Sequence, residues 1–175
     1  MARVPLIDEN DSALAPLIAK LKGARRGKLL NLYRVLLNSP SIADAWQAFN
    51  STIRFNTALD DQARELAIMR VSKLNGADYQ FQIHATKYAG EAGITPQQVA
   101  ALDGNENSSL FKPAHRALLA YTDAMTTDIE VSVSVFGKLR HHYNDAQIVE
   151  LTVLIGAYNM HTRVGRALRI DAEPQ

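Results

Sequence analysis

A carboxylate, a phenol and an imidazole lie within one short stretch of this chain, residues 65–93 (ELAIMRVSKLNGADYQFQIHATKYAGEAG). His84 has the side chain best suited to proton transfer near neutral pH, and a carboxylate such as Glu65 would orient its ring. The hydroxyl of Tyr79 could orient a substrate carboxylate or stabilise developing oxyanion charge. The three side chains therefore predict a site for general acid/base chemistry. A single histidine on a helix face is also typical of ordinary packing, and Glu65 would also suit the first turn of a helix.

The elements that must position these groups are two helices separated by Gly76. On the second helix Ala77, Gln80 and His84 follow at intervals of three and four residues, so they share one face. If the two helices pack antiparallel, Glu65 on the first returns towards His84 on the second.

Caps and helix-breaking residues predict an all-α fold of about eight to nine helices. The longest strand candidate, residues 131–136 (VSVSVF), is interpreted as the start of a helix capped by Asp128 or Ser132. A stripe of Ile42, Ala45, Trp46 and Phe49 should face inward, and residues 103–112 should form a loop. The helices are expected at about 11–22, 29–37, 41–55, 60–75, 78–92, a short segment from 95, 113–125, 132–142 and 145–168.

The composition suits one compact domain over residues 1–175, with 47% hydrophobic and 21% charged residues. The net charge of +1 gives no reason to expect a nucleic-acid partner. Zero cysteines exclude disulfides, thiolate metal sites and thiol nucleophiles. Without a signal-peptide pattern or a membrane-length apolar run, the expected location is the cytoplasm and no membrane partner is expected.

Further polar candidates lie in the C-terminal half. Arg163, beside Asn159 on the last helix, could clamp a substrate carboxylate or could simply pair on the surface. His115 is expected to be solvated at the start of its helix. His141 and the adjacent histidine diverge by about 100° on a helix, so no metal site is expected. The last helix is apolar almost all round, which favours a central position or an oligomer interface.

The spacing from Glu65 to Ala77, Gln80 and His84 resembles the core motif of the carboxymuconolactone decarboxylase and alkyl hydroperoxidase D superfamily. In that motif a Glu precedes Cys-x-x-Cys and a His follows. The resemblance extends over most of the chain and implies an AhpD-like core at about 40–125 after an N-terminal helical extension, residues 1–38. Other segments that fit are residues 31–34 (NLYR), Trp46, 74–76 (LNG), 89–94 (AGEAGI), 120–126 (AYTDAMT) and 150–160.

Both cysteine positions of the motif are replaced, by Ala77 and Gln80, so thiol peroxidase chemistry is not expected. The resemblance then implies the decarboxylase branch, which removes CO₂ from a carboxylated unsaturated lactone in aromatic-acid breakdown without a cofactor. It implies His84 as general acid/base, Glu65 as its partner, Tyr79 as a substrate-orienting donor and Gln80 as a polar lining residue. It also implies a small-molecule substrate and a homo-oligomer, whether dimer, trimer or hexamer. The alternative is a non-catalytic ligand-binding or assembly protein on the same fold.

Overall fold

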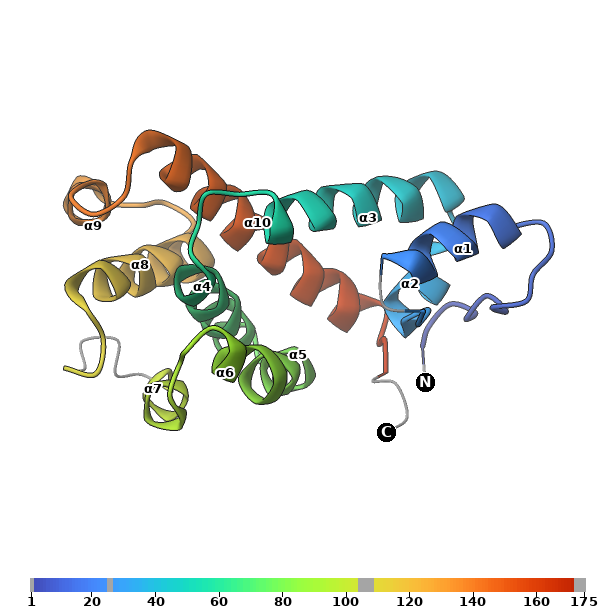
Figure 1. Cartoon of the computed structure of the whole chain (residues 1–175), viewed down its shortest axis with the longest axis horizontal. Helices are drawn as coiled ribbons and strands as arrows, with labels where there is room; N and C mark the ends of the chain where they lie inside the picture. The colour runs from blue at the N-terminus through green and yellow to red at the C-terminus, as the bar shows by residue number, and fades with distance from the viewer. Residues whose placement is uncertain (1, 25–26, 104–108, 172–175) are drawn as a thin grey trace. The chain divides into compact units, whose positions relative to one another are not determined.

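The computed structural model describes residues 2–24, 27–103 and 109–171, and these residues form helices, turns and loops without a strand. Figure 1 follows the helices along the chain. The described residues fall into two compact units, one within 1–56 and 164–175 and the other within 57–163. The all-α prediction is confirmed, and the expectation of a single domain with an N-terminal extension stays a prediction.

The first unit contains α1 (Ala15–Gly23), α2 (Asn31–Leu36) and α3 (Pro40–Phe55). Its core is an apolar cluster that includes Leu21, Tyr33 and Trp46. The first helix starts later than predicted because the carboxylate of Asp11 accepts a hydrogen bond from the backbone N–H of Ala13 in a preceding turn.

The predicted inward stripe of α3 is wrong except for Trp46, because Ala45 is exposed and Ile42 and Phe49 are 52% and 39% exposed. The buried face is rotated and includes two polar residues, Gln47 and Asn50. These can be buried because their amides find partners within the helix. The Gln47 amide donates to the Ser51 hydroxyl at 2.9 Å, and the Asn50 amide donates to a backbone carbonyl at 2.8 Å.

The second unit contains α4 (Asp61–Leu74), α5 (Asp78–Ile83), the π-helical turn η1 (His84–Tyr88), α6 (Ala89–Glu91), α7 (Pro96–Ala101), α8 (Pro113–Asp123), the π-helical turn η2 (Ala124–Asp128), α9 (Val133–Arg140) and α10 (Asp145–Ala167) as far as residue 163. Local signals set many of these boundaries. Asp60 caps α4, Thr95 forms a capping box with Gln98 on α7, and Ser132 caps α9. The segment 131–136 therefore contains the start of a helix, as predicted, with Ser132 as the cap and residues 133–136 helical.

Within this unit α4 packs against α8 on one side and against α5 and η1 on the other (Figure 1). Its buried residues include Leu66 and Met69. An ion pair also joins α4 to α8, since the guanidinium of Arg70 donates to both carboxylate oxygens of Asp123 at 2.6 and 2.8 Å. The predicted loop at 103–112 includes residues 104–108, which lie outside the described residues. Across the described ranges, no helix combines the length and the apolar character that a bilayer span requires.

Candidate functional site

The centre of the candidate site is a buried pair formed by Glu65 on α4 and His84 at the start of η1, the turn that follows α5 (Figure 1 labels α4 and α5). Nδ1 of His84 lies 2.5 Å from Oε2 of Glu65, and the two residues are 5% and 2% exposed. The chain turns between their helices at Gly76, whose φ of +61° is a conformation that glycine adopts without strain. The predicted approach of Glu65 to His84 is confirmed.

His84 sits where the α-helical hydrogen-bond pattern changes to a π-helical turn. The sequence predicts one helix over 78–92. The segment is helical from Asp78 to Glu91, but its hydrogen-bond pattern changes from α-helical to π-helical at His84 and back to α-helical at Ala89. Such π-turns occur frequently at functional sites. Nothing in the sequence indicated this local widening of the helix.

Two tyrosine rings that sequence reasoning missed flank the imidazole of His84. The ring centroid of Tyr88 lies 5.2 Å away at a tilt of 43°, and that of Tyr158 lies 5.7 Å away in an edge-on arrangement. The ring of His161 stacks on Tyr158 with centroids 5.1 Å apart. Tyr158 belongs to the apolar face of α10. The spacing of this face along the sequence indicated that Tyr158 is buried, but it could not indicate that Tyr158 packs against His84.

An arginine also lies near the carboxylate of the pair. The guanidinium of Arg64 forms an ion pair with Asp61 at 2.6 Å, and its Nε lies 3.7 Å from Oε1 of Glu65. Charged groups therefore run from the exposed start of α4 to the buried imidazole of His84. Both oxygens of Glu65 consequently have a nitrogen nearby.

Tyr79 and Gln80 lie on α5, the helix that leads into His84. Tyr79 is 44% exposed and Gln80 is partly buried, whereas His84 is almost completely buried. Their proposed contact with a substrate stays a prediction.

The amide of Asn159 lies at the centre of a hydrogen-bond network. Its oxygen accepts from Asn75 at 2.9 Å and from the Arg163 guanidinium at 2.6 Å. Its nitrogen donates to the hydroxyl of Thr126 and to the carbonyl of Ile155, each at 3.1 Å. All four hydrogen-bonding positions of the amide are used. This geometry gives Asn159 a structural role and gives Arg163 an intramolecular partner, and substrate binding by either residue stays a prediction.

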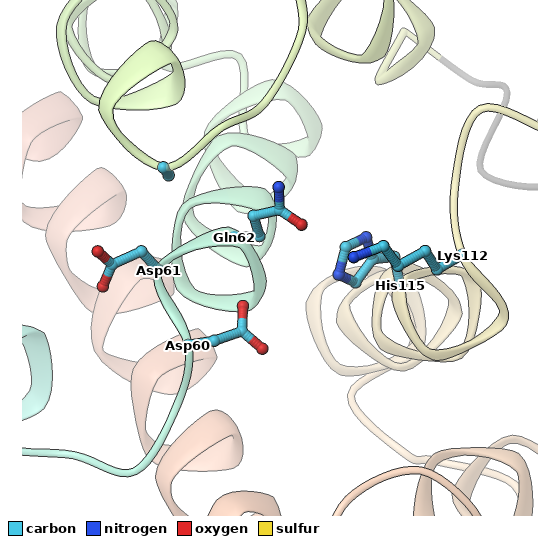
Figure 2. A pocket seen from close by; sticks show the side chains of 6 residues that line it. Asp60, Asp61, Gln62, Lys112 and His115 are labelled. Atoms are coloured by element: carbon cyan, nitrogen blue, oxygen red, sulfur yellow. The ribbon is translucent and has the colours of Figure 1, made fainter.

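A separate cavity of about 460 Å³ lies at the N-terminal ends of α4 and α8 (Figure 2). His115 lines this cavity and is only 5% exposed, so the expectation that it is solvated is wrong. The start of α8 is covered by the neighbouring end of α4, a contact that local sequence cannot indicate. Burial lowers the pKa of His115, with Asp60 acting against this shift and Lys112 acting with it. The full lining is Asp60, Asp61, Gln62, Ala92, Lys112 and His115.

Among the residues described here, no three His, Cys, Asp or Glu side chains come together in a way that could hold a metal ion. His141 and His142 lie side by side with ring centroids 5.0 Å apart and planes nearly perpendicular.

Comparisons with known proteins agree with this fold. The model of the carboxymuconolactone decarboxylase family matches residues 40–124. The uncharacterised protein YdfG of Bacillus subtilis is 26% identical over 114 residues, which cover 64% of this chain and 77% of YdfG. A crystal structure from Agrobacterium tumefaciens, of a protein of unknown function proposed as an antioxidant defence protein AhpD, has a TM-score of 0.73 at 27% identity, covering 80% of this chain and 96% of that one. The debrominase Bmp8, solved as a cysteine-to-alanine variant with 2,3,4-tribromopyrrole, has a TM-score of 0.79 at 19% identity. The match covers 99% of this chain and 94% of the Bmp8 chain.

Proposed function

Because the chain belongs to the carboxymuconolactone decarboxylase and AhpD-like superfamily, we propose that it is a cofactor-independent carboxy-lyase acting on a small carboxylated lactone or a related intermediate of aromatic degradation. The observation that carries this proposal is the buried pair of Glu65 and His84, joined at 2.5 Å. A histidine held in one orientation by a carboxylate is the usual arrangement of a general acid/base.

The proposed reaction begins when the bond between the substrate carbon and its carboxylate breaks. CO₂ leaves, and the electron pair enters the conjugated lactone as an extended enolate. Because Nδ1 of His84 donates to Glu65, Nε2 is the nitrogen that delivers a proton to carbon. His84 therefore enters this step as an imidazolium, which Glu65 stabilises, and the ring is neutral after the transfer until a proton from solvent returns to Nε2.

The surroundings of His84 support a reaction that benefits from the exclusion of water. The rings of Tyr88 and Tyr158 pack against the imidazole, and a dry site strengthens electrostatic interactions with a developing negative charge. In the proposed complex, Tyr79 orients the substrate carboxylate and Gln80 lines the site. Arg163 and Asn159 are proposed as more distant substrate contacts.

Thiol chemistry does not fit this chain, although its structural relatives include proteins associated with AhpD and a debrominase. A thiol peroxidase needs a thiolate to attack the peroxide and a second thiol to resolve the product. The sequence has no cysteine, and Ala77 and Gln80 occupy the two motif positions. Proton transfer by His84 needs neither thiol.

A second candidate function is a non-catalytic ligand-binding or assembly protein of the cytoplasm. The observation that favours it is the 5% exposure of His84, since packing of this kind is also typical of a structural histidine. For either function we propose a homo-oligomer. Val149, Val153 and Met160 are exposed on one face of α10 and would be covered by another copy. Light scattering at micromolar concentration tests this, and a monomer would contradict it.

The experiment that separates the two functions is decarboxylation of 4-carboxymuconolactone, followed by ultraviolet absorbance. Replacing the proton donor in His84→Ala should lower the rate by about 10²–10⁴-fold. His142→Ala, at an exposed histidine, is the matched control and should keep the wild-type rate. Equal rates in wild type and His84→Ala would reject the assigned role, and no turnover by wild type would favour the binding protein.

A further inference from the structure

The cavity at the N-terminal ends of α4 and α8 has two walls of different character (Figure 2). Lys112 and His115, from the start of α8, form one wall, and their side chains point towards Asp60 and Gln62 at the start of α4. None of the lining residues belongs to the pair of Glu65 and His84 or to the rings around it. The cavity is therefore a distinct feature that the proposed reaction does not use.

The wall formed by α8 carries a positive charge and an imidazole nitrogen for which the described residues provide no partner. His115 is nine-tenths buried, and its Nδ1 makes no hydrogen bond to any residue in the described ranges. The ammonium of Lys112 has no ion pair within the same ranges. No side chain caps the N-terminus of α8, an 11-residue helix whose dipole favours an anion there.

The acidic wall, in contrast, is largely compensated by the protein itself. Oδ1 of Asp60 accepts a hydrogen bond from the backbone N–H of Ala63 at 2.8 Å and so caps α4. Oδ1 of Asp61 pairs with the guanidinium of Arg64 at 2.6 Å. In the described ranges the Lys112 ammonium lacks an ion pair and Nδ1 of His115 lacks a hydrogen bond, and both groups suit an anionic ligand, while Asp60 keeps a carboxylate that no ion pair balances there.

We propose that this cavity binds a small organic carboxylate, held by Lys112, His115 and the N-terminus of α8. Its volume of about 460 Å³ falls in the range of ordinary small-molecule sites, about 300–1,000 Å³. A singly charged carboxylate is favoured over a phosphate because Asp60 faces the same space, and its repulsion grows with the charge of the ligand.

The charges around His115 make this binding depend on pH. Asp60 faces it from the start of α4, whereas the Asp61 carboxylate points away (Figure 2). Lys112 lies three residues before it in the chain, and the Tyr143 hydroxyl donates to the carbonyl of the adjacent Ala114 at 3.5 Å. Burial holds His115 neutral near pH 7, and a bound carboxylate would favour its protonated form. Affinity for a carboxylate should therefore rise as the pH falls from 8 to 6.

The test is a titration of the full chain with sodium acetate, followed by ¹H–¹⁵N NMR at pH 6 and pH 8 at constant ionic strength. Saturable shifts should appear at the starts of α4 and α8, with tighter binding at pH 6. Lys112→Met removes an exposed charge without altering the core and should weaken binding at least about fivefold, by analogy with one lost charge-assisted hydrogen bond. Lys138→Met, at an exposed lysine outside the cavity, is the matched control and should bind as wild type.

Inorganic phosphate, titrated in the same way, distinguishes the class of anion. Tighter binding of phosphate than of acetate would overturn the assignment to a carboxylate. The absence of saturable shifts, or equal affinities in wild type and Lys112→Met, would overturn the site itself. Because no turnover is measured, the result is independent of whether His84 is a catalyst.

Discussion

Replacing Glu65 by Gln tests the buried pair on which the proposed function depends. Nδ1 of His84 and Oε2 of Glu65 are 2.5 Å apart, and both residues are at least nine-tenths buried, so solvent screens their interaction little. Hydrogen bonds to charged groups retain about 1.5–3 kcal/mol.

Glu65→Gln should therefore lower the free energy of unfolding by about 1.5–3 kcal/mol, which is about 3–12 °C in melting temperature for a chain of this size. Urea unfolding followed by circular dichroism measures the change. A double-mutant cycle with His84→Leu isolates the interaction, and we expect a coupling energy of about 1.5–3 kcal/mol. Glu150→Gln is the control, because Glu150 accepts a backbone hydrogen bond at 2.9 Å near the surface. A coupling below about 0.5 kcal/mol, within the error of additivity, would refute the view that Glu65 holds the imidazole of His84.

Three further predictions concern stability. Asp123→Asn breaks an ion pair with a buried arginine and should lower the free energy of unfolding, measured in urea, by about 2–4 kcal/mol. Asp44→Asn breaks an exposed pair with a lysine at the same 2.6 Å distance and should lower it by less than about 1 kcal/mol. Similar losses in the two variants would contradict the reasoning. Burial lowers the pKa of His115 below 6.5, so the unfolded chain takes up a proton that the folded chain resists. The free energy of unfolding should then fall as the pH drops below about 6.5, and His115 should contribute up to about 1.4 kcal/mol of this loss per pH unit. An unchanged pH dependence of stability in His115→Gln would refute this origin. Gly93→Ala should lower the free energy of unfolding by about 1–2 kcal/mol, because φ of residue 93 is +71° and a Cβ there would lie 3.1 Å from a glutamine amide. Gly90→Ala, in open space on a helix, should be neutral or stabilising. Equal melting temperatures of the two variants would count against strain at residue 93.

Much of the fold could be predicted from the sequence because the signals that start and stop helices act over a few residues. The helix starts near residues 60 and 95 and the turn at Gly76 are all found where the sequence placed them, and the structure assigns the caps to Asp60 and Thr95. The juxtaposition of Glu65 and His84 was accessible as a conditional prediction, since two helices joined by a tight turn can pack antiparallel and bring these residues together. The absence of cysteine, which removes thiol chemistry, is a property of the sequence alone.

Burial and partner choice were decided by the tertiary structure, because they depend on residues that are distant in the chain. The face of α3 that is buried could not be predicted, since Asn50 becomes tolerable inside only once its amide has a partner. The packing of Tyr158 against His84 depends on how α10 crosses η1, and the π-turn has no known local code. The burial of His115 likewise follows from α4 lying beside α8. The sequence therefore determined which chemical groups are available, and the packing of distant helices decided which of them are dry, paired or left facing a cavity.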